Sequence, residues 1–248
     1  MPPATFVAHI RTLALIILGH AGWRPERSRP GWVAAIVASF GLALGLQALD
    51  DPRSTILWFV VVWVFYYVGL SLLVGDRRRE REIRRYGEEA AFARFEPIVG
   101  VMFLNQGLAV GAVSALTDPA LALPLSSSIA IPLGVAMCVT GLVVKVWATA
   151  LVGLDVYYYK DLFLGRPLGP LVERGPYRFF SHPMYGLGHL HAYGFALLAG
   201  STAGLIAAAI CQLSIYGFCL LVEGPFVERL KSDTPALAFS RPSPKEGP

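Results

Sequence analysis

Long runs of apolar residues, separated by short polar segments, limit the folds that this sequence can adopt. Residues 55–74, TILWFVVVWVFYYVGLSLLV, form the clearest run. A helix that spans a membrane needs about 20 predominantly apolar residues. Only 15% of the 248 residues are charged, whereas about 25% is typical of a soluble domain. The sequence therefore predicts an all-α fold, that of a polytopic membrane protein.

Seven segments meet this requirement, and the last two are separated by only a few small residues. We therefore expect the chain to end its membrane region with a helical hairpin. Lys145 interrupts the fifth segment. The first segment contains His9 and Arg11 and lacks a clear cleavage site, so we do not expect a cleaved signal peptide. The predicted spans are 5–22, 32–48, 55–74, 98–117, 129–153, 184–200 and 203–222.

The basic residues of successive loops predict an orientation. Lys and Arg number three in 23–31, seven in 75–97, four in 154–183 and four in 223–248. The intervening loops have one or none. Because basic loops stay in the cytoplasm, the N-terminus is predicted outside and the C-terminus in the cytoplasm.

Three regions divide the chain: N-terminal spans in 1–128, a second membrane region in 129–232 and a disordered cytoplasmic tail in 233–248. The loop 75–97 is predicted to be a solvated helix, or alternatively a contact for anionic lipid headgroups.

Cys138, Cys211 and Cys219 are scattered through apolar runs, so we interpret them as core residues. We expect no metal site and no nucleic-acid partner; the oligomeric state is left open.

The candidate chemistry lies in 175–194, GPYRFFSHPMYGLGHLHAYG, which holds three of the five histidines. Pro183 is typical of a first helical turn, so we expect a helix to begin there and present free N–H groups to the preceding loop. On that helix Tyr185 and His189 would share a face with His182. Polar ionisable groups in a membrane protein are candidates for function.

Glu223 ends the last predicted span. If the two final helices are antiparallel, Glu223 returns to the level of His182, and a carboxylate and an imidazole meet at one site. Glu228, further along, is interpreted as solvated.

The segment GPYRFFSHPMY, followed about 40 residues later by EGPF, resembles the integral-membrane methyltransferases that use S-adenosylmethionine. These include isoprenylcysteine carboxyl methyltransferases and phosphatidylethanolamine N-methyltransferases. HPMY, VEGPF and TALVGLDVYYYKDLF are more similar to the phospholipid group. The resemblance covers roughly residues 130–232. Ser181 and Gly224 stand where the family pattern has Arg and a second Glu.

The resemblance implies a methyl transfer from S-adenosylmethionine to a membrane lipid, with the amine of phosphatidylethanolamine or its methylated forms as the expected acceptor. His182 and Glu223 are the expected catalytic residues. Asp155, Tyr158, Tyr159 and His191 are expected to contact the lipid substrate. The residues expected around the cofactor are Tyr177, Arg178, His182, Tyr185, Gly186, Gly188 and Glu223.

Three alternatives remain open from the sequence. The acceptor could instead be a prenylated cysteine carboxylate or a small thiol. A sterol-type, NADPH-dependent membrane reductase has a similar region, although it typically carries His-Pro-Asn-Tyr rather than the His-Pro-Met-Tyr of this chain. The replacement of the second Glu by Gly224 leaves an inactive relative as the third alternative.

Overall fold

The computed structural model describes residues 3–20, 22–25, 29–166, 172–226 and 228. Within these ranges the chain is helical, apart from connecting segments and an isolated β-bridge between Ala122 and Ser201. Five segments are long and apolar enough to cross a membrane: α2 (Pro30–Leu49), α3 (Pro52–Val74), α5 (Glu88–Ser114), α6 (Ser127–Val152) and Thr202–Phe226. The protein is therefore an all-helical membrane protein. The predicted tail 233–248 lies outside the described residues.

The last of these segments comprises α10 (Thr202–Phe218) and a π-helical turn, η5 (Cys219–Glu223). The remaining helices are short or lie at the ends of the bundle: α1 (Pro3–His20), α4 (Asp76–Tyr86), α7 (Leu154–Tyr157), α8 (Lys160–Leu164) and α9 (Leu190–Leu198). Single 3₁₀ turns form η2 (Pro119–Leu121), η3 (Gly175–Arg178) and η4 (Leu187–His189).

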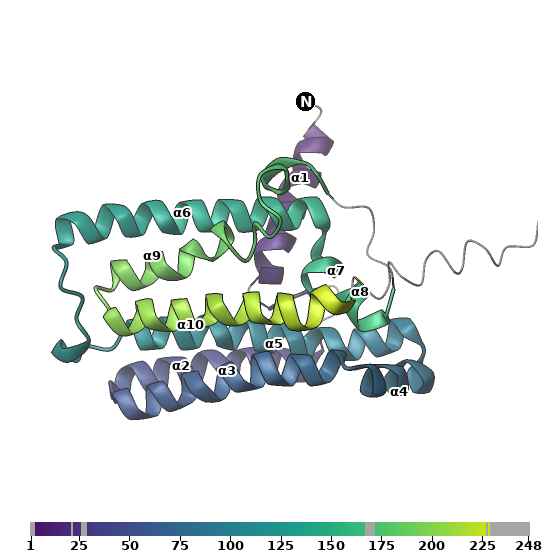
Figure 1. The fold of residues 1–248 in the computed structure, drawn as a ribbon, viewed down its shortest axis with the longest axis horizontal. Coiled ribbons are helices and arrows are strands. Elements are labelled where there is room, and N and C mark those ends of the chain that lie inside the picture. The colour runs from purple at the N-terminus through teal and green to yellow at the C-terminus, as the bar shows by residue number, and fades with distance from the viewer. Residues whose placement is uncertain (1–2, 21, 26–28, 167–171, 227, 229–248) are drawn as a thin grey trace, which may run out of the picture.

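The predicted count of seven spans is not confirmed. Figure 1 shows α1 crossing the long helices instead of running beside them. α9 has nine residues, which gives a length of about 14 Å, whereas the hydrocarbon core of a bilayer is about 30 Å thick. α9 packs against α10, and Ala199, Gly200 and Ser201 connect the two helices. The fourth predicted span, 98–117, overlaps α5, which starts ten residues earlier at Glu88 and ends at Ser114.

Small residues set the close packing of α6 against α9. A Cβ atom added to Gly134 would lie 3.0 Å from the carbonyl oxygen of Gly194, and one added to Gly194 would lie 2.6 Å from Sγ of Cys138. One added to Gly141 would lie 2.3 Å from the backbone nitrogen of His191. Glycines allow such backbone approach between membrane helices. Cys138 and Cys211 are buried in the core, as the sequence predicts.

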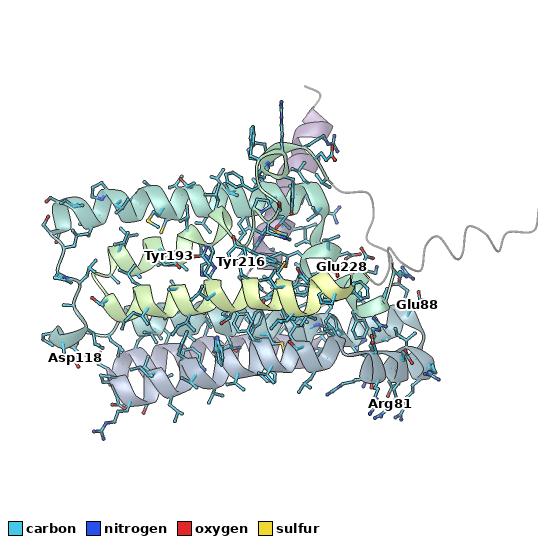
Figure 2. The ribbon with its side chains drawn as sticks, in the orientation of Figure 1. Arg81, Glu88, Asp118, Tyr193, Tyr216 and Glu228 are labelled. Atoms are coloured by element: carbon cyan, nitrogen blue, oxygen red, sulfur yellow. The ribbon has the colours of Figure 1, made fainter. Side chains whose placement is uncertain are left out.

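The loops gather at two ends of the bundle that differ in charge. At one end, the backbone nitrogen of Thr117 donates to Asp50 at 3.1 Å, and that of Leu123 donates to the oxygen of Gly200 at 2.7 Å. At the other end, Arg166 pairs with Glu88. Figure 2 shows Asp118 at the first end and Arg81 and Glu88 at the second. The described parts of the Lys- and Arg-rich loops 75–97 and 154–183 thus share one end, which we call the basic end.

A buried ion-pair network ties three segments together near the basic end. Arg24, which follows α1, pairs with the fully buried Glu96 of α5. Its Nη1 also lies 2.8 Å from Oδ1 of Asp155 in α7, whose other oxygen is 3.0 Å from Nζ of Lys160. Partial burial acts to raise the pKa of the Asp155 carboxyl, but the hydrogen bonds from Arg24 and Lys160 hold this pKa below its ordinary value. Asp155 therefore stays ionised at neutral pH and keeps both cations in place.

Candidate active site

A hydrogen-bonded cluster joins the turn at His182–Tyr185 to the end of the last long helix. The Tyr185 hydroxyl donates to Oε1 of Glu223 at 2.7 Å. The His182 ring stacks on the Tyr185 ring, with the centroids 5.8 Å apart and the planes 9° apart. Sγ of Cys219 lies 3.6 Å from Nε2 of His182, and its thiol interacts electrostatically with Glu223. An imidazole, a phenol, a thiol and a carboxylate from two distant segments therefore form one cluster.

The chain reaches this cluster through a turn and not through a helix start. The prediction that a helix begins at Pro183 is wrong, because α9 begins at Leu190. The backbone nitrogens of Tyr185 and Gly186 donate to the oxygen of His182 at 3.1 and 3.0 Å, and that of Gly188 donates to the oxygen of Pro183 at 2.8 Å. These bonds close wide turns that end in the 3₁₀ turn η4. His182 is exposed while Tyr185 is partly buried, so the cluster extends from the surface into the bundle.

Two glycines let the neighbouring helices approach this turn from opposite sides. A Cβ atom on Gly186 would lie 2.9 Å from the hydroxyl of Tyr216 in α10. One on Gly188 would lie 3.3 Å from Cβ of Lys145 in α6. Both contacts are tighter than ordinary van der Waals contact, so the turn is held closely between α6 and α10.

The π-helical turn places Cys219 and Glu223 at the cluster. The backbone nitrogen of Gly224 donates to the oxygen of Cys219, five residues earlier, and not to the residue four earlier, as in an α-helix. A Cβ atom at Gly224 would lie 3.3 Å from that same oxygen. A side chain at position 224 would therefore crowd the turn, and π-helical turns inside α-helices are frequent at functional sites.

Sequence reasoning missed three residues of this region: Gln212, Tyr216 and Cys219. Nε2 of Gln212 donates to the oxygen of Tyr185 at 3.2 Å, and the hydroxyl of Tyr216 lies at the Gly186 turn. Figure 2 shows Tyr216 on α10. With Glu223 they follow one another at intervals of four, three and four residues, which is the spacing of one helix face. This periodicity of polar residues in an apolar span was the signal in the sequence.

Tyr159 extends the cluster into the core. Its hydroxyl interacts electrostatically with those of Tyr66 and Tyr185, and its ring packs edge-on against Phe218 at 5.4 Å. Its φ angle of 59° is in the left-handed region, which is uncommon for a residue other than Gly, Asn or Asp. The chain accepts this conformation where α7 ends and α8 begins, and it carries the ring toward Tyr185.

Three of the four residues expected to contact the lipid have other partners. Asp155 belongs to the ion-pair network, and the fully buried Tyr158 donates to the oxygen of Gly19 at 2.8 Å. Nδ1 of His191 is 2.6 Å from the oxygen of Gly188. His189, expected on the face of His182, instead places Nε2 3.0 Å from the oxygen of Ala208. The structure does not bring these four side chains into the cluster, and a substrate contact for Asp155, Tyr158 and His191 stays a prediction.

Tyr177 and Arg178 lie in η3, beside the C-terminal end of α6. Burial raises the pKa of the Tyr177 hydroxyl to about 12, so this group is a neutral donor at physiological pH. Arg178 stacks on Phe179 at 5.7 Å, and Phe179 and Phe180 are 75% and 47% exposed. A loop with an arginine and exposed aromatic rings is typical of a membrane interface.

Within the described ranges, no group of three or more His, Cys, Asp or Glu side chains is arranged to hold a metal ion. The chemistry of the cluster is that of the Glu223 carboxylate, which accepts a hydrogen bond from the neutral hydroxyl of Tyr185.

Comparison with known sequences connects this geometry to a family. The part of the chain that carries the cluster is the part that matches a family of known proteins. Residues 129–232 match the phospholipid methyltransferase family. This region contains α6 to α10 and every side chain of the cluster except Tyr66, which lies in α3.

Curated proteins similar to this chain are named phosphatidylethanolamine N-methyltransferase. The protein of Schizosaccharomyces pombe is 36% identical over 39% of this chain and 10% of its own length. That of Kluyveromyces lactis is 31% identical over 42% of this chain and 12% of its own length. That of Malassezia globosa is 27% identical over 95% of this chain and 23% of its own length. The chain therefore spans about a tenth to a quarter of these relatives. No solved structure matches the chain.

Proposed function

We propose that the protein transfers a methyl group from S-adenosylmethionine to a membrane-embedded acceptor, the amine of phosphatidylethanolamine or of its methylated forms. Residues 129–232 would be the catalytic core, and His182 and Glu223 the catalytic residues. The observation that carries the proposal is the hydrogen bond between Tyr185 and Glu223, beside His182, inside the region that matches the phospholipid methyltransferases.

The charge of the cluster supports this reaction. The amine of the acceptor headgroup is mostly protonated at neutral pH and is a nucleophile only after it loses a proton. Glu223 offers a carboxylate to accept that proton, and Tyr185 donates a hydrogen bond that fixes the orientation of this carboxylate. His182, at the exposed side of the cluster, is placed to pass the proton on to water.

The residues present fit S-adenosylmethionine. The stacked faces of His182 and Tyr185 suit its positively charged sulfur or its adenine ring, and Glu223 suits its cationic or hydroxyl groups. Gly186 and Gly188 permit close approach to the backbone. When bound, the donor would supply a methyl group on a positively charged sulfur, and no metal would be needed.

The positive-inside rule supports an orientation with the basic end in the cytoplasm. The cluster, the start of α2 and the end of α10 would then lie at the cytoplasmic face, where a water-soluble donor and a membrane lipid can both reach it. The count of seven spans, the closing helical hairpin and an external N-terminus remain part of this proposal.

The direct test is the transfer of labelled methyl from S-adenosylmethionine into total lipid by purified protein in lipid nanodiscs. We expect label in a phospholipid headgroup band, with loss of the label in His182→Ala. If no lipid is labelled but the donor binds, a prenylcysteine or small-thiol acceptor replaces the lipid. If the donor does not bind, the proposed function is wrong, and binding of reduced nicotinamide would then identify a reductase.

Tyr185→Phe removes the hydroxyl that donates to Glu223 and keeps the ring that stacks on His182. A hydrogen bond to a charged group contributes about 1.5–3 kcal/mol, so we expect kcat/KM to fall about 10- to 100-fold. Tyr86→Phe is the matched control, because this tyrosine lies at the exposed end of α4, outside the cluster. Equal losses in the two variants would contradict a specific role for Tyr185.

A further inference from the structure

We infer that Lys145 binds an oxyanion of one of the two ligands, beside the 182–188 turn that also carries the hydrogen bond from Tyr185 to Glu223. The inference rests on the proposed function and adds to it the group that holds the negative end of a zwitterionic ligand. A charged lysine inside an apolar span raises the free energy of the folded protein in the membrane. Such residues mark binding sites or ion paths in membrane proteins.

Lys145 lies on the inner face of α6. On the same face, Cys138 is within hydrogen-bonding distance of the oxygen of His191, Gly141 faces the backbone of His191, and Thr149 contacts His20 and Met184. These residues recur every three or four positions, so Lys145 points toward the same neighbours and not toward lipid. Seven residues separate it from Val152, at the end of α6, so its Cα lies about 10 Å from that end.

The neighbours of Lys145 are neutral. Its Nζ lies 6.0 Å from the centre of the Tyr157 ring, and its Cβ faces Gly188. His20, His189 and His191 interact with it electrostatically, and each directs one ring nitrogen to a backbone oxygen. In the part of the chain that the structure describes, no ion pair joins Lys145 to a carboxylate. An anion from a ligand would provide the missing counter-charge.

The position of Lys145 relative to Glu223 suits a zwitterion. Tyr216 of α10 and Glu223 of η5 approach the 182–188 turn, and Lys145 approaches it from α6. Both proposed ligands carry opposite charges at a short distance: an ammonium and a phosphodiester in the lipid, a sulfonium and a carboxylate in the donor. Glu223 takes the positive group of such a ligand, and Lys145 its oxyanion.

The experiment measures ligand binding and kinetics of Lys145→Met in dodecyl maltoside micelles, which contain no phosphate. Met keeps an unbranched side chain of similar length without the charge, and an apolar side chain is favourable inside a membrane span. The probes are S-adenosylhomocysteine, 5′-methylthioadenosine, which lacks the carboxylate, and phosphatidylethanolamine. Arg81→Gln, which removes an exposed cation of α4, is the matched control, and Lys145→Arg keeps the charge.

Loss of a charged hydrogen bond predicts a weakening of about tenfold or more. If the donor carboxylate is the ligand, Lys145→Met weakens binding of S-adenosylhomocysteine but not of 5′-methylthioadenosine. If the lipid phosphodiester is the ligand, the KM for phosphatidylethanolamine rises and S-adenosylhomocysteine binding is unchanged. In either case Lys145→Arg restores part of the loss and Arg81→Gln shows none. Unchanged binding and unchanged KM in Lys145→Met overturn the inference.

A second readout needs no variant. Reductive methylation of Lys145 in the wild-type protein, followed by mass spectrometry, is expected to slow about tenfold with a saturating ligand, and equal labelling with and without both ligands overturns the inference. The two proposals can fail separately. If the wild-type protein transfers no methyl group, the proposed function is wrong. If the wild-type protein is active but Lys145→Met changes neither ligand binding nor KM, only the oxyanion site is wrong.

Discussion

Glu223→Gln is expected to reduce the rate of methyl transfer by about 100-fold or more, in a protein that remains folded. Gln keeps the shape of the side chain and can still accept the hydrogen bond from Tyr185, but it cannot accept a proton from the headgroup amine. The loss should therefore appear in kcat, with saturating donor and lipid, because the group removed acts in the proton transfer and not only in binding.

The measurement is the initial rate of label transfer in nanodiscs across a range of pH. In the wild-type protein the rate should rise with pH as the base becomes ionised, and this acid limb should be absent in Glu223→Gln. Glu228→Gln is the matched control, because Glu228 is an exposed carboxylate close in the chain. A Glu223→Gln protein that turns over as fast as the control would remove Glu223 from the catalytic residues.

The membrane region was predictable because it depends on composition over long windows. Each of the five long segments contains or overlaps a predicted span, and the charge of the loops follows the two ends of the bundle. The ends of the elements were less predictable. Pro183 has the residue type of a helix start, yet Gly186 and Gly188 are packed against Tyr216 and Lys145, and these tertiary contacts favour a wide turn.

The cluster was predictable only in part, for a similar reason. Tyr185, His182 and Glu223 belong to motifs that stand out in an apolar chain, and the structure brings them together. Cys219 reaches the cluster through a π-helical turn, and no residue pattern in the sequence predicts such a turn. Asp155 has the same residue type as a binding carboxylate, but its partner Arg24 is 131 positions away, so its place in an ion-pair network could not be deduced from local sequence.

Arg24→Met is expected to lower the free energy of unfolding by about 3–5 kcal/mol, because it leaves the fully buried Glu96 without the guanidinium that pairs with it. The measurement is the shift of the unfolding midpoint in detergent. Arg166→Gln is the control: it breaks the pair with Glu88, whose side chains are 45% and 46% exposed, and such exposed pairs contribute about 1 kcal/mol or less.

Arg24→Met combined with Glu96→Gln separates the charge from the packing. If the loss of the guanidinium beside the Glu96 carboxylate causes the destabilisation, the double variant recovers much of the stability, because its buried side chain is then neutral. Activity should recover with it, since the network fixes α7, which precedes Tyr159, the residue whose hydroxyl interacts with that of Tyr185. An Arg24→Met protein no less stable than Arg166→Gln would mean that Glu96 accepts burial without Arg24, and that the network does not hold the N-terminal segment to the catalytic half.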